Sequence, residues 1–365
     1  MYLNANISLG LNLSDTSENT AVPNSISVVS FIGIFILCFY IIVYSTSTVG
    51  NFVVLYICHR SGRSAAFKPT RTGFFNRYIA NLAIADLLFT QLTVFDAVYA
   101  ILADWVFGAA MCKLQGFLVE LCYSAAILTL IAISRERRKS ISDLEMKSRI
   151  QRIKERKIFS IIVWIVAFVL CSPLLYAYNV VKTETENGIS RCNNIAWLHI
   201  GRRIYYSITI VILFVFPLTI MIWTQLKIKR VLNAQVVANQ QIAALTRARQ
   251  KKASRMLSSV TLVFFVLWSP FILTRTLRYF AWYEGEIMWK LSQLLTLASS
   301  AANPFIYSFY SLHYRIFIKR LITCQCRRFM AKSENVPTST AISLYWNYVK
   351  IRNILMALLL RTEDW

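Results

Sequence analysis

Seven long apolar runs divide this chain. A run of about 18 or more residues with few charges is long enough to cross the hydrocarbon core of a bilayer as a helix. The runs lack the alternation of a barrel strand and are about twice its length. Because lipid offers no partners to the backbone, we predict an all-α bundle of seven transmembrane helices. These helices lie at about residues 28–57, 77–102, 110–136, 158–179, 204–226, 256–281 and 288–311.

The basic residues give this predicted bundle an orientation. Of the 40 Lys and Arg residues, 32 lie in the segments 58–77, 135–157 and 227–255 and in the tail from residue 312. Segments rich in Lys and Arg stay in the cytoplasm, so we place the N-terminus outside the cell. The formal net charge of +23 therefore follows from membrane topology and does not indicate nucleic-acid binding. Its cytoplasmic location suits membrane lipids with anionic headgroups, and acidic partner surfaces.

The overall composition agrees with a membrane protein. Apolar residues make up 56% of the chain and charged residues 16%. Soluble domains contain about 45–50% apolar and about 25% charged residues. This difference excludes a soluble enzyme, a disordered chain and a small disulfide-stabilised scaffold.

Two modifications are expected on the extracellular side. Asn6 and Asn12 each begin an Asn-X-Ser glycosylation sequon in the segment placed outside. Among the eight cysteines, only Cys112 and Cys192 fall on the oxidising side, at the start of the third helix and before the fifth. Two candidates allow one pairing, so we predict a disulfide between them. The alternative is two free extracellular thiols.

The extracellular loop before the fifth helix carries a hairpin signal. Residues 181–192 read VKTETENGISRC, so polar and apolar positions alternate around an Asn-Gly pair. This pattern is the strongest short-range indication of a two-residue turn between antiparallel strands. We therefore predict a β-hairpin at the mouth of the bundle.

Short motifs follow one another along the seven runs. They are Gly50-Asn51, NLAIAD at 81–86, SRERR at 134–138, Trp164, Phe214 with Pro217, Phe264 with LWSP at 267–270, and NPFIY at 303–307. In this order they resemble the rhodopsin-like (class A) G-protein-coupled receptors, and the loop hairpin is similar to that of the neuropeptide receptors. The resemblance implies a plasma-membrane receptor that activates heterotrimeric G proteins through outward movement of helix six. It implies no enzymatic activity, and it adds arrestin and receptor kinases as partners.

The resemblance also assigns roles to residues inside the helices. An activation switch is implied at Glu136, Arg137, Pro217, Phe264, Trp268, Pro270, Asn303, Pro304 and Tyr307. A pocket for an allosteric sodium ion, the only cofactor expected, is implied at Asn51, Asp86, Ser299, Ser300 and Asn303. Asp86 is notable without the resemblance, because a carboxylate within an apolar span costs several kcal/mol and is a functional-site hypothesis by default.

The segment after the seventh helix resembles the short amphipathic helix that lies along the membrane in this family. The resemblance rests on HYRIF at 313–317. Cys324 and Cys326 follow it and are candidates for palmitoylation. We divide the chain into an extracellular segment (1–27), the receptor domain (28–311), the amphipathic helix (312–326) and a cytoplasmic tail (327–365).

Three positions depart from the family pattern on the cytoplasmic side. Arg138 replaces the tyrosine that usually follows the key arginine. Gln225 replaces a tyrosine that normally helps to hold the active state, and Glu145 replaces an apolar contact to the G protein. These departures motivate the hypothesis that coupling is weaker than usual, and Arg138 and Gln225 motivate a weakly signalling or scavenging receptor as a rival function.

The outer half of the predicted bundle indicates the kind of ligand. Val119 stands where amine receptors carry an aspartate, and Leu297 where opsins carry the retinal lysine, which argues against both classes. Asp96 and Glu120 lie at membrane depth, where buried acids need partners. Two interpretations stay open, which are contact with a basic group of a short peptide and an internal salt bridge to Arg275. The predicted ligand-binding set is Asp96, Gln115, Val119, Glu120, Tyr123, Arg275, Arg278 and Gln293.

Two other functions compete with a peptide receptor. A class A receptor for a lipid or another small molecule would share the fold, but the hairpin and the outer acids would not contribute to its activation. A membrane transporter would usually show internal repeats and paired Gly/Pro breaks within its spans. No repeat is evident in this sequence, which favours the receptor.

Overall fold

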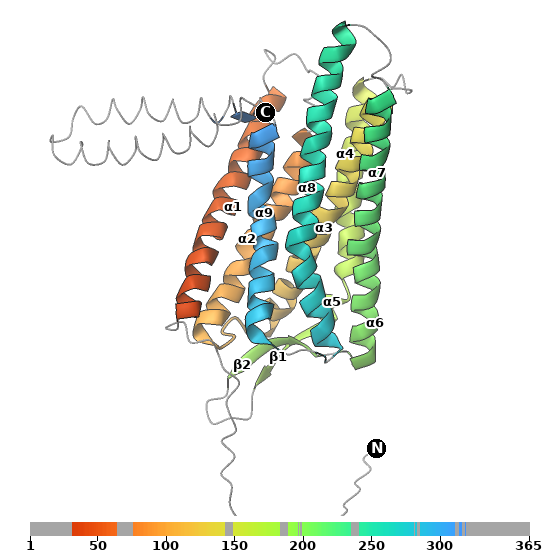
Figure 1. Cartoon of the computed structure of the whole chain (residues 1–365). Coiled ribbons are helices and arrows are strands. Elements are labelled where there is room, and N and C mark those ends of the chain that lie inside the picture. The colour runs from red at the N-terminus through yellow and green to blue at the C-terminus, as the bar shows by residue number, and fades with distance from the viewer. Residues whose placement is uncertain are drawn as a thin grey trace, which may run out of the picture.

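The computed structural model describes residues 31–63, 76–142, 149–182, 189–195, 197, 199–234, 241–280, 282, 285–310, 314, 315 and 318. Within these ranges, long helices run side by side as a single bundle (Figure 1). The first four crossings are α1 (Phe31–Arg63), α2 (Asn76–Leu102), α3 (Gly108–Ser142) and α4 (Arg149–Cys171). The fifth combines α6 (His199–Ile210), a π-helical turn (Val211–Val215) and α7 (Phe216–Ala234), and the last two are α8 (Gln241–Tyr279) and α9 (Glu286–Tyr310).

Six of these crossings are long and apolar enough to span a membrane by length and composition. The seventh, α9, is more polar because it faces the inside of the bundle between α1 and α8. Its residues Ser292, Thr296, Ser299, Ser300 and Asn303 are all buried. Polar side chains within a membrane are tolerated where they face other helices and not lipid. The predicted fold class, a seven-helix bundle, is confirmed.

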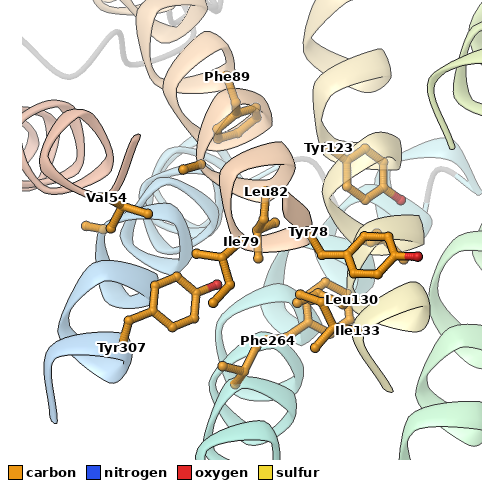
Figure 2. Close-up of a cluster of buried hydrophobic side chains, with 14 of the residues drawn as sticks. Val54, Tyr78, Ile79, Leu82, Phe89, Tyr123, Leu130, Ile133, Phe264 and Tyr307 are labelled. Atoms are coloured by element: carbon orange, nitrogen blue, oxygen red, sulfur yellow. The ribbon is translucent and has the colours of Figure 1, made fainter. Parts of the chain in front are cut away.

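The buried core joins α2, α3, α8 and α9 near the middle of the bundle. Figure 2 shows Leu82, Leu130 and Phe264 converging there, and all three are at most 4% exposed. In a membrane, helices associate through close packing and polar contacts and not through the hydrophobic effect. Gly50 of α1 allows such close packing, because a Cβ at this position would lie 2.9 Å from Cγ of Pro304 in α9.

Proline interrupts three of the crossings. Pro270 lies inside α8 and Pro304 inside α9, and the π-helical turn ends two residues before Pro217. Proline lacks a backbone N–H and disturbs the hydrogen-bond ladder of a helix. π-helical turns in α-helices often occur at functional sites. These irregular segments give α7, α8 and α9 the places at which a helix can bend.

The extracellular end carries the predicted hairpin. β1 (Tyr178–Lys182) pairs with β2 (Ser190–Asn194) antiparallel, with Val180 opposite Cys192 (Figure 1). The predicted disulfide is also confirmed, because Cys192 is bonded to Cys112 at the start of α3. The bond fixes the hairpin to the mouth of the bundle. The turn itself, including Asn187 and Gly188, lies outside the described residues.

Several helix ends differ from the prediction. The fourth helix was expected at 158–179, but α4 spans Arg149–Cys171 and is followed by the short α5 (Leu174–Ala177) and by β1. The helix stops before Ser172-Pro173 because proline cannot continue its hydrogen bonding. α4 begins at Arg149 and α8 at Gln241, before the predicted spans at 158 and 256. A helix makes its backbone hydrogen bonds within itself, so it can continue beyond the bilayer. Hydrophobicity marks only the membrane-embedded part.

Some predicted features lie outside the described residues. These are Glu145, the sequons at Asn6 and Asn12, the cysteines Cys324 and Cys326, and most of the expected amphipathic helix at 312–326. They stay predictions, as do the domain boundaries that depend on them.

Candidate functional site

A cavity of about 180 Å³ lies between α1, α2, α3, α8 and α9. Five residues of the predicted ligand-binding set line it: Asp96, Val119, Glu120, Tyr123 and Gln293. Trp268 and Phe89 form part of its wall, and their rings are 6.3 Å apart. The cavity therefore connects the predicted ligand-binding residues directly to the predicted activation switch.

Two acids line this cavity, Asp96 and Glu120, and the described partner of Asp96 is a neutral side chain. Both of its carboxylate oxygens accept a hydrogen bond from Nε2 of Gln115 at 3.0 Å. Within the described part of the chain, the salt bridges are Arg156–Glu136 and Arg275–Glu120, so neither involves Asp96. Lys290 lines the same cavity. A buried carboxylate without an ion-pair partner attracts a cationic group.

Glu120 forms an internal ion pair. Its Oε1 accepts a hydrogen bond from Nη1 of Arg275 at 2.6 Å, and the two side chains are 12% and 2% exposed. The Arg275 guanidinium also lies 5.0 Å from the ring centres of Tyr206 and Phe271. Of the two interpretations left open by the sequence, the salt bridge holds for Glu120. It joins α3 to α8 across the outer half of the bundle.

Arg278 lies near this site but is not among the residues that line the cavity. Its guanidinium is 5.0 Å from the ring centre of Trp289 in α9. Gln115 also lies behind the lining and reaches the cavity only through Asp96. The predicted set therefore contains residues that line the cavity and residues that support it.

Below the cavity, aromatic side chains form a continuous stack. The ring of Trp268 is 4.6 Å from that of Tyr123 and nearly parallel to it, and 5.8 Å from that of Phe264. Phe264 in turn is 6.1 Å from Phe214, which lies in the π-helical turn of the fifth crossing. Aromatic pairs at these separations are in favourable contact. A group that displaces Tyr123 would move Trp268 and, through it, the inner part of α8.

A polar pocket surrounds Asp86 farther toward the cytoplasm. Its Oδ1 accepts a hydrogen bond from the Ser300 hydroxyl at 3.0 Å, and its Oδ2 accepts one from Nδ2 of Asn303 at 2.8 Å. Asn51 donates to the Ser300 carbonyl at 3.1 Å, and its own Oδ1 is buried without a described donor. Ser299 is buried beside Ser300 in α9. A carboxylate, hydroxyls and an amide oxygen are the ligand types that a hard cation accepts, so these residues fit the implied sodium ion.

Known proteins share sequence similarity with this chain. The sequence profile of the 7 transmembrane receptor (rhodopsin family) matches residues 50–307. This chain belongs to that family. It is therefore a multi-pass receptor of the plasma membrane and not an enzyme.

Individual relatives in this family are receptors for neuropeptide Y and for galanin. Human galanin receptor type 3 is 30% identical over 313 residues, which cover 84% of this chain and 82% of that receptor. The neuropeptide Y receptor type 4 of Mus musculus is 27% identical over 335 residues, which cover 84% of each protein. The galanin receptor type 2 of Rattus norvegicus is 30% identical over 291 residues, 76% of this chain and 73% of that one.

Three neighbouring helices are tied together by one asparagine of the receptor. Asn81 in α2 donates a hydrogen bond to the Thr129 hydroxyl in α3 at 2.7 Å, and it accepts one from the Trp164 indole in α4 at 2.8 Å. Interhelical hydrogen bonds of this kind contribute about 0.6 kcal/mol each in membrane bundles. The sequence motif at 81–86 therefore contributes both this junction and Asp86.

The cytoplasmic end contains a contact that the sequence did not indicate. Glu136 forms a salt bridge with Arg156 of α4. Arg137, the next residue of the predicted activation switch, is half-buried at this end of α3. Arg156 comes from a basic segment in which one arginine cannot be told from its neighbours by sequence. Only the packing of α4 against α3 singles it out.

Gln225, one of the departures from the family pattern, connects α7 to α8. Its Oε1 accepts hydrogen bonds from the hydroxyls of Ser254 and Ser258 at 3.4 and 3.2 Å. On the same side of the bundle, the hydroxyls of Ser259 in α8 and Tyr310 in α9 are 2.8 Å apart. Tyr307, predicted as part of the switch, is buried beside Tyr314 with their rings 6.1 Å apart.

Sequence reasoning missed part of the cavity wall. Tyr40, Thr93 and Lys290 line it but were absent from the prediction. For Lys290 a signal was available, because it precedes Gln293 by three residues and Leu297 by seven. Such spacing places residues on one helix face. Thr93 of α2 gave the same signal, because it precedes Asp96 by three residues, whereas Tyr40 gave none, because α1 is apolar on nearly all sides.

Proposed function

We propose that this receptor is activated by a short extracellular peptide that carries a basic group, and that it then activates heterotrimeric G proteins. The observation that carries the proposal is the cavity in which Asp96 has no described ion-pair partner while Glu120 is paired with Arg275. The similarity to galanin and neuropeptide Y receptors supports a peptide as the ligand.

Asp96 is the contact for the basic group in this proposal. A cation that reached Glu120 would have to compete with an arginine at 2.6 Å. At Asp96 it would compete only with the neutral amide of Gln115, which the carboxylate can keep as a second partner. Residues of α1, α2 and α9 supply most of the cavity wall, and the disulfide fixes the hairpin to α3.

Signal transfer in this proposal runs from the cavity through Tyr123, Trp268 and Phe264 to the inner half of α8. The inner half must separate from α7 when it swings outward around Pro270. The hydrogen bonds of Gln225 to Ser254 and Ser258 are long, at 3.4 and 3.2 Å, and hydrogen bonds between neutral groups contribute only about 1 kcal/mol each. These contacts therefore oppose the movement weakly.

A sodium ion at Asp86 belongs to the same proposal. Asp86, Asn51, Ser299, Ser300 and Asn303 would hold it. When bound, the ion supplies a positive charge that offsets the buried carboxylate. Asp86 already receives hydrogen bonds from two groups of α9, so its charge state affects how α2 packs on α9. Arrestin and receptor kinases are proposed as later partners.

The experiment is a G-protein dissociation assay in cells that express the receptor, with a library of synthetic neuropeptides. For an active peptide that contains Lys or Arg, we expect Asp96→Asn to raise the half-maximal concentration at least tenfold. Asp96→Glu, which keeps the charge, should lose much less. When the basic residue of the peptide is replaced by Gln, wild-type receptor and Asp96→Asn should respond with the same potency, because the peptide then has no cation for Asp96 to bind.

Two results would contradict the proposal. If wild-type receptor at the cell surface responds only to lipids or to uncharged small molecules, the ligand class is wrong. If peptides activate the receptor but Asp96→Asn raises the half-maximal concentration by the same factor for peptides with and without the basic residue, Asp96 does not contact that residue.

A further inference from the structure

We infer that the cytoplasmic ends of α3 and α7 form a binding site for the headgroup of an anionic phospholipid, built from Arg138, Trp223 and Lys227. This site is separate from the extracellular cavity, and its occupation requires no agonist. It rests on the charge and exposure of three side chains that the proposed function does not use.

Two cations share one aromatic ring at this site. The Arg138 guanidinium lies 4.9 Å from the ring centre of Trp223, and Nζ of Lys227 lies 4.3 Å from the same centre. The two positive charges are therefore less than 10 Å apart. The π-face of an indole attracts a cation, so Trp223 holds both side chains in place while each leaves donors for another group.

No described carboxylate neutralises this pair. The salt bridges in the described ranges involve Arg156 and Arg275, not Arg138 or Lys227. Two like charges at this separation repel each other, and a bound anion offsets this repulsion. Arginine binds phosphate through two parallel N–H groups and lysine binds it as a point charge. The pair therefore suits a phosphate group.

The surroundings favour a lipid over a soluble phosphate. Trp223 is 46% exposed, and Ile222 and Leu226 beside it on α7 are 47% and 48% exposed. Lys227 lies four residues before the end of the apolar stretch that closes at Val231. The site is thus at the level of the cytoplasmic headgroups, where tryptophan is enriched and the leaflet carries negative charge. An acyl chain can lie against α7 while the phosphate meets the cations.

Arg138 makes this chain different from its family. The usual residue at this position is a tyrosine, which would bring no charge to Trp223. The arginine and its aromatic partner come from different crossings, α3 and α7, which pack against each other. A bound headgroup would therefore link the two helices on the lipid-facing side.

The test measures lipid binding to the full-length receptor purified in detergent, by native mass spectrometry with added phosphatidylserine. We expect one phosphatidylserine to bind more tightly than the others, and Arg138→Gln with Lys227→Gln to weaken it roughly 10- to 30-fold, since each cation near a leaflet contributes about one factor of five. The matched control is Lys229→Gln with Arg230→Gln, which removes two exposed charges from the same helix. The control should change binding less than threefold.

Further arms separate the alternatives. Phosphatidylcholine should show no site-specific binding, and the water-soluble glycerophosphoserine should bind much more weakly than the intact lipid. Arg138→Lys should keep most of the affinity, which distinguishes lost charge from lost folding. Equal losses in the two double variants, or tight binding of glycerophosphoserine alone, would overturn the lipid site. Unchanged lipid binding together with a lost G-protein response would show that these cations bind a protein instead.

Discussion

The ion pair between Glu120 and Arg275 allows a sharp prediction about stability. Replacing Glu120 by Gln leaves an arginine that is 2% exposed without its carboxylate at 2.6 Å. Removing one partner of a buried pair usually costs about 3–5 kcal/mol, because the remaining charge stays away from water. At roughly 2–4 °C per kcal/mol, the apparent Tm should fall by roughly 6–20 °C. Arg275→Gln should cost less, because Glu120 lines the cavity.

The assay is thermal unfolding of the purified receptor without ligand, followed with a thiol-reactive dye. Cys122 and Cys171 are buried at 2% and 1% exposure, so the dye reaches them when the bundle opens. Single variants and the double variant form a cycle. We expect the double loss to be smaller than the sum of the single losses by more than about 1 kcal/mol, because the groups are in contact.

Asp96→Asn is the matched control, since Asp96 lines the same cavity without a described ion pair. It should lower the Tm by only a few degrees. If Glu120→Gln also costs less than about 1 kcal/mol, or if the two single losses simply add, the pair does not stabilise the free receptor. Glu120 would then be available to a ligand, and the preference for Asp96 would lose its basis.

Two further predictions concern the extracellular end. A Cβ on Gly116 would lie 2.6 Å from the ring of Tyr178, so Gly116→Ala should lower the free energy of unfolding by roughly 1–3 kcal/mol through overpacking. Gly201→Ala is the control, because its Cβ would meet nothing closer than 3.6 Å. It should be neutral or stabilising in the same unfolding assay. Cys112→Ser removes the disulfide between residues 80 positions apart and should lower the free energy of unfolding by roughly 4 kcal/mol. We expect this loss to appear as low expression at the cell surface. Cys38→Ser, which replaces an exposed free thiol, is the control and should express normally.

The sequence alone determined the seven crossings, their orientation and the disulfide. Each of these is a local statement about solvation: whether a segment is apolar enough for lipid, whether its flanking charges stay in the cytoplasm, and which thiols meet an oxidising environment. The hairpin is equally local, because alternation around an Asn-Gly pair predicts it from one short segment. α4 and α8 begin before the predicted membrane spans, since hydrophobicity reports the bilayer and not the helix.

Only the tertiary structure decided which polar groups meet. Glu120 and Arg275 are 155 residues apart, and the sequence offered Asp96 as an equally good partner for that arginine. Arg156 was one of ten basic residues in its segment, and nothing in the sequence set it apart from them. The choice among such candidates depends on how each helix is rotated about its axis and on which neighbours it packs against. A one-dimensional pattern of apolar residues does not contain that rotation when a helix is apolar on nearly all sides, as α1 is.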